Sequence, residues 1–385
     1  MLSALFAGVI ALSASALEVS PFAPPPKPAQ TIVRLLAPSG AFTAKTLREF
    51  ERESGAAVAY DAYGDPARIP AMMKEAPYDV VILPGPALAR AVAAGQLRKL
   101  DKAQFPNAKR VAPPVAAKLM AYDPGGADAI AWGWSATGLL YDAGKVPQLL
   151  GAPPNSWGAA LAPDVARKLA PCGVALPDAR DESFIAAWRL LGVDPASLRE
   201  REVTAAADLI LRARAAVRLP ISRDPITAIA GGAVCLTFGG AAQADIASRR
   251  SREGGAGFDI RFAAPREGGP MAIDALAEPR DAPHPKEAAA LIDFLLRPAV
   301  AAEATASAGL ASAQTAAPTD NFRALWPVGV YDPKLVPAIE KEWARTRANP
   351  QAEGKPQGKP GSKPATKPAT KPANKPAGKP TRTKR

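Results

Sequence analysis

Histidine and cysteine are scarce in this chain, and their scarcity excludes several kinds of chemistry. The one histidine, His284, stands between Pro283 and Pro285, in a loop where it is poorly placed as a general base. Two cysteines and one histidine do not supply the four-ligand cluster of a zinc site. A Gly-x-Ser-x-Gly nucleophile elbow is also missing, because the stretch 133–137 lacks the closing glycine. We therefore predict a protein that is not an enzyme and that uses no metal or cofactor.

The chain has no transmembrane signal at its apolar N-terminus. The uncharged run from Leu2 to Leu12 is shorter than the roughly 20 residues that span a bilayer. It is followed by Ala14-Ser15-Ala16, whose small residues suit signal peptidase, although no Lys or Arg precedes the run. The alternative is a buried helix, which the Pro-rich stretch 21–28 disfavours. We predict a signal peptide over residues 1–16, a Pro-rich linker over 17–30 and a periplasmic protein.

Acidic residues are absent from the C-terminal end. Lys355 to Arg385 holds ten Lys or Arg residues, which leaves 38 basic and 36 acidic residues, a net charge of +2, for Met1 to Gly354. Lys-Pro recurs every four residues from Lys355 to Lys379, and no aliphatic side chain larger than alanine is present to form a core. We predict a disordered tail over 348–385 that is extended by proline and that binds polyanions or only aids solubility.

Apolar runs alternate with amphipathic stretches between Thr31 and Asp101. The expected strands are 32–36, 57–60 and 79–83, and the expected helices are 43–53, 69–75 and 88–96. Strands separated by such helices are typical of a parallel sheet with helices on both faces, so the fold class is α/β.

The two cysteines flank apolar sequence, Cys172 before Gly173-Val174 and Cys235 before Leu236. In an exported protein they most simply pair, although two buried free thiols remain an alternative.

Several segments together resemble the spermidine/putrescine-binding proteins of bacterial ABC importers. They run in order along the chain: Phe50 to Gly55, Tyr78 to Val81, Ala94 to Leu97 with Leu100 to Lys102, Trp134 to Tyr141, Asn155 to Trp157, Cys172 to Val174, Asp181 to Phe184, and Phe294 to Pro298. The resemblance implies a type II periplasmic-binding-protein fold, in which two α/β lobes close on a ligand about hinge crossings. It also implies a disulfide between Cys172 and Cys235.

The chain crossings that fit this fold are Trp134 to Tyr141 and a return strand over 258–265. We expect lobe 1 to comprise 31–136 and 249–299, and lobe 2 to comprise 137–248 and 300–347.

The resemblance also implies where a ligand binds. Ser39, Glu182 and Asp274 match ligand-binding positions of the family, and carboxylates suit the ammonium groups of a polyamine. Other positions that are aromatic, acidic or serine in the family carry different residues: Pro84, Gly240, Gln243, Ala272 and Leu310. We expect an eroded or altered site, and polyamine, another small ligand or no ligand all remain open. Trp132, Trp134 and Trp157 are expected to pack in the core or at the hinge.

The function that the resemblance implies is that of the periplasmic solute-binding component of an ABC importer, and the expected partners follow from it. They are a small-molecule ligand, namely a polyamine or related amine, and an ABC permease, with the protein itself a monomer. The alternative function is a non-transporting envelope scaffold whose basic tail binds anionic polymers such as lipid headgroups, lipopolysaccharide or cell wall.

Overall fold

A computed structural model of the chain describes residues 30–217, 221–314 and 322–348. The described residues up to Thr346 belong to one compact unit. The predicted signal peptide, Pro-rich linker and Lys-Pro tail lie outside the described residues, apart from the single residues Gln30 and Ala348. None of the helices within the described ranges has the length and apolar character that crossing a bilayer demands.

In the described part of the chain, seven strands form one mixed sheet, which we call the first sheet. Its spatial order is β11-β4-β10-β3-β1-β2, with β12 beside β10. The strands are β1 (Ile32–Pro38), β2 (Ala57–Tyr63), β3 (Val80–Pro84), β4 (Ala129–Ala136), β10 (Pro270–Ala277), β11 (Ala311–Ser312) and β12 (Trp326–Pro327). β1, β2 and β3 run parallel, as predicted, whereas β10 runs antiparallel to both β3 and β4.

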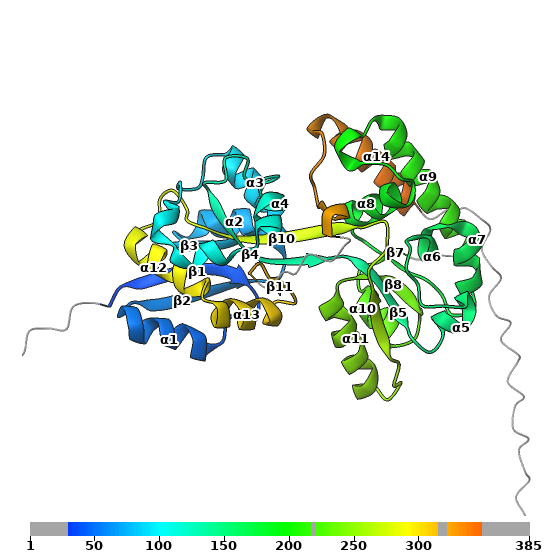
Figure 1. The fold of residues 1–385 in the computed structure, drawn as a ribbon, viewed down its shortest axis with the longest axis horizontal. Coiled ribbons are helices and arrows are strands. Elements are labelled where there is room, and N and C mark those ends of the chain that lie inside the picture. The colour runs from blue at the N-terminus through cyan, green and yellow to red at the C-terminus, as the bar shows by residue number, and fades with distance from the viewer. Residues whose placement is uncertain (1–29, 218–220, 315–321, 349–385) are drawn as a thin grey trace, which may run out of the picture. The chain divides into compact units, whose positions relative to one another are not determined.

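Helices cover both faces of the first sheet, which confirms the α/β prediction (Figure 1). They are α1 (Ala44–Ser54), α2 (Ile69–Glu75), α3 (Gly85–Ala93), α4 (Pro113–Leu119), α12 (Pro285–Leu295) and α13 (Pro298–Ser307), with the 3₁₀ turns η1 (Pro66–Arg68), η2 (Lys102–Gln104), η3 (Pro106–Arg110) and η6 (Phe322–Ala324). Alternate residues of β1 point to opposite faces, because Val33 and Leu35 pack with α1 and α12 while Leu36 packs with α2, α3 and α4. Trp132 lies fully buried in the first of these cores.

A three-stranded antiparallel sheet of order β8-β5-β9, the second sheet, lies in the rest of the described chain. Its strands are β5 (Gly138–Asp142), β8 (Leu236–Gly239) and β9 (Ile260–Ala263), and a further short pair joins β6 (Leu176–Pro177) to β7 (Ile221–Ser222). Around them lie α5 (Val146–Leu150), α6 (Gly158–Leu161), α7 (Pro163–Ala166), α8 (Arg180–Leu190), α9 (Glu200–Val217), α10 (Pro225–Ala230), α11 (Ala241–Glu253) and α14 (Val336–Arg347), with η4 (Arg167–Leu169), η5 (Pro195–Ser197) and η7 (Pro333–Leu335). The larger core here contains Trp157, Phe184 and Trp188.

The chain passes from the first sheet to the second between β4 and β5, at Thr137, within the predicted crossing 134–141. The Thr137 N–H donates to the carbonyl oxygen of Pro270, the first residue of β10, at 2.9 Å, so the outgoing and returning segments lie side by side. Gly138 allows the close approach of β5 to β9, because a Cβ atom there would lie 2.6 Å from the carbonyl oxygen of Ala263.

Strand pairing groups residues 249–314 differently from the predicted lobe boundaries. β9 pairs with β5, so the predicted return strand over 258–265 still belongs to the second sheet, and the chain rejoins the first sheet only at β10. α13 packs with α12, β4 and β11 of the first sheet, although the prediction gave residues from 300 onward to lobe 2. Local sequence patterns predict a strand but not the strand with which it pairs. For this reason the chain returns to the first sheet at β10 and not at the predicted segment 258–265. The division into two lobes stays a prediction.

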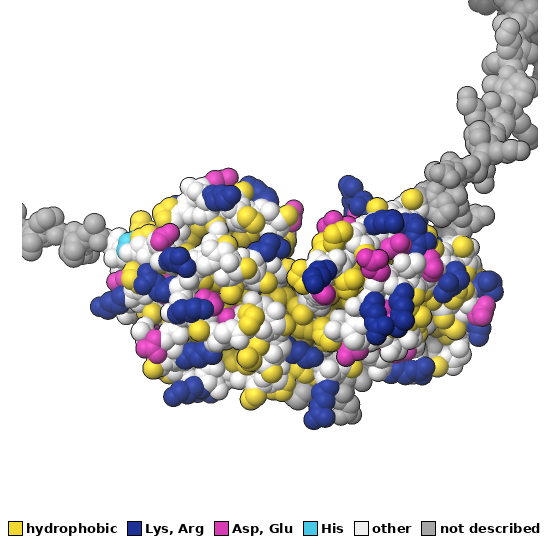
Figure 2. All heavy atoms as spheres, turned by 90° about the horizontal axis from the view of Figure 1, so that it is seen from above, with side chains coloured by type: hydrophobic (Ala, Val, Ile, Leu, Met, Phe, Trp, Pro, Cys, Tyr) yellow, Lys and Arg dark blue, Asp and Glu magenta, His cyan; other side chains and the backbone are white. Residues whose placement is uncertain are grey.

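The surface charge agrees with the small net charge of the body. Figure 2 shows Lys and Arg side chains scattered over the face in view, with Asp and Glu side chains between them. No single basic patch gathers the described cations on this face.

Candidate functional site

The carboxyl ends of β1, β2 and β3 meet at one edge of the first sheet, and the predicted residue Asp274 lies at this edge. It pairs across the ladder with Pro84, the last residue of β3, at an irregularity in the pairing of β10 with β4. Ligands of open α/β sheets bind outside the carboxyl ends of the strands. This edge is therefore the expected place for a ligand.

Asp274 is a buried carboxylate without a partner. Its exposed fraction is 9%, and within the described residues no hydrogen-bond donor or cation pairs with its carboxylate oxygens. Burial raises the pKa of Asp274 to about 7, because the charged form loses water and gains no compensating group. Such a carboxylate is suited to receive a cation.

Glu182 lies in the first turn of α8 and is partly buried. Burial raises the pKa of Glu182, the neighbouring charge of Asp181 adds to this, and Arg180 opposes it. Asp181 is already bonded, since its Oδ1 accepts from Arg180 Nε at 2.8 Å and from the Tyr331 hydroxyl at 3.1 Å. Of these two adjacent acids, Glu182 is thus the one left for a ligand.

Tyr122 connects the two predicted acids. It is 2% exposed, and its hydroxyl donates to the carbonyl oxygen of Val328 at 2.7 Å. Burial is the main cause that raises the pKa of Tyr122, and the negative charges of Asp181, Asp274 and Glu182 raise it further. The elements that carry Asp274 and Glu182, β10 and α8, are also in contact with each other.

Tyr63 and Ser39 complete this edge. The Ser39 N–H donates to the carbonyl oxygen of Tyr63 at 2.9 Å, and the Ser39 side chain is exposed. The hydroxyl of Tyr63 donates to the carbonyl oxygen of Ile82 at 3.1 Å. Burial raises the pKa of Tyr63, with the charge of Asp274 as a second cause, so this ring too lies near the carboxylate.

The sequence analysis did not identify Tyr63 and Tyr122 as site residues. Tyr63 ends a strand that was expected to stop at Tyr60, and Tyr122 follows a helix that no periodic pattern marked. Their nearness to Asp274 depends on the antiparallel placement of β10, which local sequence does not encode. A sequence signal for Tyr122 does exist in hindsight, because Gly85 is the small residue on which its ring packs.

Two of the positions that differ from the family, Gly240 and Gln243, lie at the start of α11. The Oε1 atom of Gln243 accepts from the N–H of Gly240 at 2.8 Å and so caps the start of α11. A Cβ atom on Gly240 would meet only the carbonyl oxygen of Ala136, at 3.7 Å. The surroundings of Gly240 therefore leave space for a Cβ atom, and this residue places no aromatic ring there.

Two of the predicted packing tryptophans are fully buried, with Trp157 donating its indole N–H to the carbonyl oxygen of Gly268 at 2.7 Å. Trp134 is only partly buried and packs edge-on against Phe322. In the ranges that the structure describes, no three His, Cys, Asp or Glu side chains gather in a way that could hold a metal ion.

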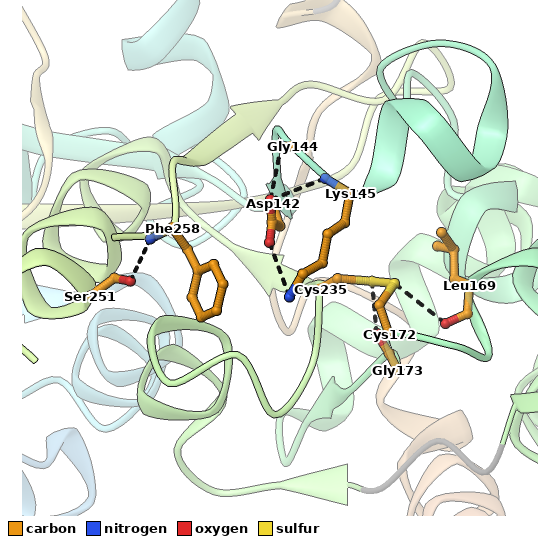
Figure 3. Close-up of polar contacts among 9 residues, drawn as sticks. All are labelled: Asp142, Gly144, Lys145, Leu169, Cys172, Gly173, Cys235, Ser251 and Phe258. Carbon is orange, nitrogen blue, oxygen red and sulfur yellow. Dashed lines mark hydrogen bonds and ion pairs between the residues drawn. A yellow bond between two sulfur atoms is a disulfide. The ribbon is translucent and has the colours of Figure 1, made fainter. Parts of the chain in front are cut away.

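Cys172 and Cys235 form a disulfide with a Cα–Cα distance of 5.4 Å (Figure 3). The predicted pairing is thereby confirmed. The bond joins the segment before Val174 to the residue that precedes β8, and the Cys235 N–H donates to the carbonyl oxygen of Gly173 at 3.0 Å. Nearby, Asp142 Oδ1 accepts from the N–H of Gly144 at 2.8 Å, which fixes the turn after β5.

Comparison with known proteins identifies the family. The model of the bacterial extracellular solute-binding proteins matches residues 45–327. The chain belongs to this family. The putrescine-binding periplasmic protein of Escherichia coli (strain K12) is 31% identical over 324 residues, which cover 79% of this chain and 88% of that protein. The putrescine/agmatine-binding protein of Pseudomonas aeruginosa is 32% identical over 293 residues, 75% of this chain and 80% of that protein.

Solved structures agree on the fold of this solute-binding protein. A spermidine/putrescine ABC transporter substrate-binding protein from Streptococcus pneumoniae superposes with a TM-score of 0.71 at 14% identity, covering 83% of this chain and 99% of that chain. The fold is therefore that of the type II periplasmic binding proteins, as predicted. The relatives are binding proteins and not enzymes.

Proposed function

We propose that this protein is the periplasmic solute-binding component of an ABC importer and that it binds a polyamine or related amine through an altered site. The observation that carries the proposal is the buried, unpartnered carboxylate of Asp274 at the carboxyl edge of the first sheet. An ammonium group supplies the charge and the hydrogen bonds that this carboxylate lacks. The names of the relatives support the same ligand class.

The two available carboxylates favour a short diamine. Asp274 and Glu182 remain free to pair with one ammonium group each, whereas Asp181 is bonded to Arg180 and Tyr331. Gln243 is neutral and bonded to its own helix, so it offers no third charge. A ligand with two ammonium groups would match this charge count, and a longer polyamine would leave one group unpaired.

The loss of aromatic rings weakens the site without removing its charge. Each cation-π contact contributes about 0.5–2 kcal/mol, and the positions Gly240, Ala272 and Leu310 contribute none. Tyr63 and Tyr122 lie near Asp274, but both hydroxyls are bonded to backbone carbonyls. We therefore propose an affinity below that of a site with the full aromatic set.

Calorimetric titration tests the proposal. The purified protein is unfolded and refolded to remove any bound amine and is then titrated with putrescine and with spermidine. We expect saturable binding that is tighter for putrescine and that is lost in Glu182→Gln and Asp274→Asn. Glu303→Gln, which changes an exposed acid on α13, is the matched control and should bind as the unchanged protein does.

The absence of heat at millimolar amine would refute amine binding. The envelope scaffold would then become the better hypothesis, since its function depends on the Lys-Pro tail and on anionic polymers instead of the cleft. Both that role and the monomeric state stay predictions.

A further inference from the structure

A polar cavity lies apart from the residues of the proposed amine site. Its volume is about 480 Å³, and none of Ser39, Glu182 and Asp274 lines it. The residues that line it come from α4, from the end of α8 with the loop after it, and from the segments around residues 267 and 323–326. They are Lys118, Arg189, Gly192, Val193, Asp194, Glu267, Arg323, Ala324 and Trp326.

Arg189 brings an unpaired guanidinium to this cavity. It lies in the last turn of α8, with its guanidinium carbon 5.9 Å from the centre of the Trp326 ring. Its Nε atom is buried and has no acceptor, and none of its guanidinium N–H groups bonds to another described residue. Burial lowers the pKa of Arg189, and the negative charge of Asp194, which is not within ion-pair distance, only partly opposes this. The terminal N–H groups of the guanidinium, which are not among the buried atoms, therefore remain as unused donors at the cavity wall.

Lys118 adds a second cation, which forms no ion pair with another described residue and has Asp194 as the opposing charge nearby. Its Nζ donates to the carbonyl oxygens of Leu325 at 2.6 Å and Arg323 at 3.4 Å, which are neutral acceptors. Burial lowers the pKa of Lys118, and the positive charge of Arg189 lowers it further. The two cations thus repel each other across the cavity. The exposed side chain of Arg323 lines the same cavity and increases the positive charge.

The two acids of the cavity wall are already bonded. Asp194 accepts from the N–H of Ala196 at 3.1 Å and so caps η5. Glu267 accepts from the Ser156 hydroxyl and lies 3.6 Å from Arg266 Nε. With three cations against two bonded acids, the wall keeps an excess of positive charge.

We propose that this cavity binds a small oxyanion, a carboxylate or phosphate group held by the guanidinium of Arg189 and the ammonium of Lys118. The two terminal N–H₂ groups of a planar guanidinium match two oxygens of such an anion, and the ammonium supplies the third donor. The volume admits a molecule of a few non-hydrogen atoms beside the group that is bound. The site is separate from amine binding and does not depend on it.

An anion here would also connect two parts of the fold. Lys118 belongs to α4, which packs on the first sheet, while Arg189 belongs to α8, whose core lies with the second sheet. A bound anion would form hydrogen bonds to both cations and so offset the repulsion between them. The bound anion would hold α4 and α8 together.

Titration of the full chain with inorganic phosphate, and separately with succinate, tests the proposal. At physiological ionic strength we expect saturable binding that weakens about tenfold or more in Arg189→Gln, the loss of one charge-assisted bidentate contact. Arg189→Lys keeps the charge but not the planar guanidinium, so its affinity for the anion should lie between that of the unchanged protein and that of Arg189→Gln. Arg212→Gln, which removes an exposed arginine from α9, is the matched control and should leave binding unchanged.

The design separates this site from the basic tail and from the amine site. Binding that is equally tight in Arg189→Gln would belong to other cations, including those of the tail, and would overturn the proposal. Absence of binding of both probes up to about 10 mM would overturn it as well. A preference for phosphate or for succinate identifies which oxyanion the cavity suits. Putrescine titrations of the same variants should be unchanged, so either proposal can fail alone.

Discussion

Replacing Asp274 by asparagine should stabilise the ligand-free protein while it abolishes amine binding. Burial raises the pKa of this carboxyl from 3.8 to about 7. The folded state therefore holds its proton more tightly than the unfolded state, and stability falls as the pH rises from about 4 to about 7. Above that pH range the buried carboxylate is charged, which lowers the free energy of unfolding by about 4 kcal/mol. The neutral amide of asparagine avoids part of this loss.

Urea denaturation at two pH values measures this cost. Because asparagine does not titrate, its advantage over aspartate should be about 2.5 kcal/mol larger near pH 8 than near pH 5. Comparing the two pH values cancels any packing difference between the side chains. If the advantage of Asp274→Asn is the same at both pH values, the carboxyl does not pay a burial cost and the argument for a ligand ammonium loses its basis.

Three further predictions concern the surroundings of the site. Replacing both Cys172 and Cys235 by serine should lower the free energy of unfolding by about 4 kcal/mol, by denaturation without reductant, and an unchanged value would mean that the disulfide does not constrain the unfolded chain. Gly240→Trp should add one cation-π contact and tighten putrescine binding by about 0.5–2 kcal/mol, since an added Cβ atom would meet only the carbonyl oxygen of Ala136, at 3.7 Å, and unchanged or weaker binding would refute the expected contact. In Gly85→Ala the new methyl group would overlap the ring of Tyr122, so calorimetry should show weaker amine binding, whereas unchanged affinity would mean that the position of this ring does not matter.

The sequence predicted the first part of the fold closely. The expected strand 32–36 and helix 69–75 match β1 and α2 within two residues at each end, because periodic apolar residues define both. The third expected helix, 88–96, begins earlier, at Gly85. Pro86 is tolerated in its first turn, where no intrahelical N–H bond is needed, although proline reads as a break in a sequence pattern.

The site was only partly predictable. Asp274 and Glu182 were found through their resemblance to family positions, and their own local sequence does not distinguish them from solvated acids. The insertion of β10 between β3 and β4 pairs residues that are far apart in the chain, and it places Tyr63 and Tyr122 near the carboxylate. Pairing over such distances depends on the whole fold and leaves no periodic signal. For the same reason the Arg189 cavity could not be seen in the sequence.

The last described helix has a consequence for how the chain is made. Ile339 and Trp343 of α14 belong to the same core as Trp157 and Phe184, which the ribosome adds much earlier. That core is complete only after the residues of α14 have been synthesised. Truncation before Val336 should leave this core unfinished even where the first sheet is complete.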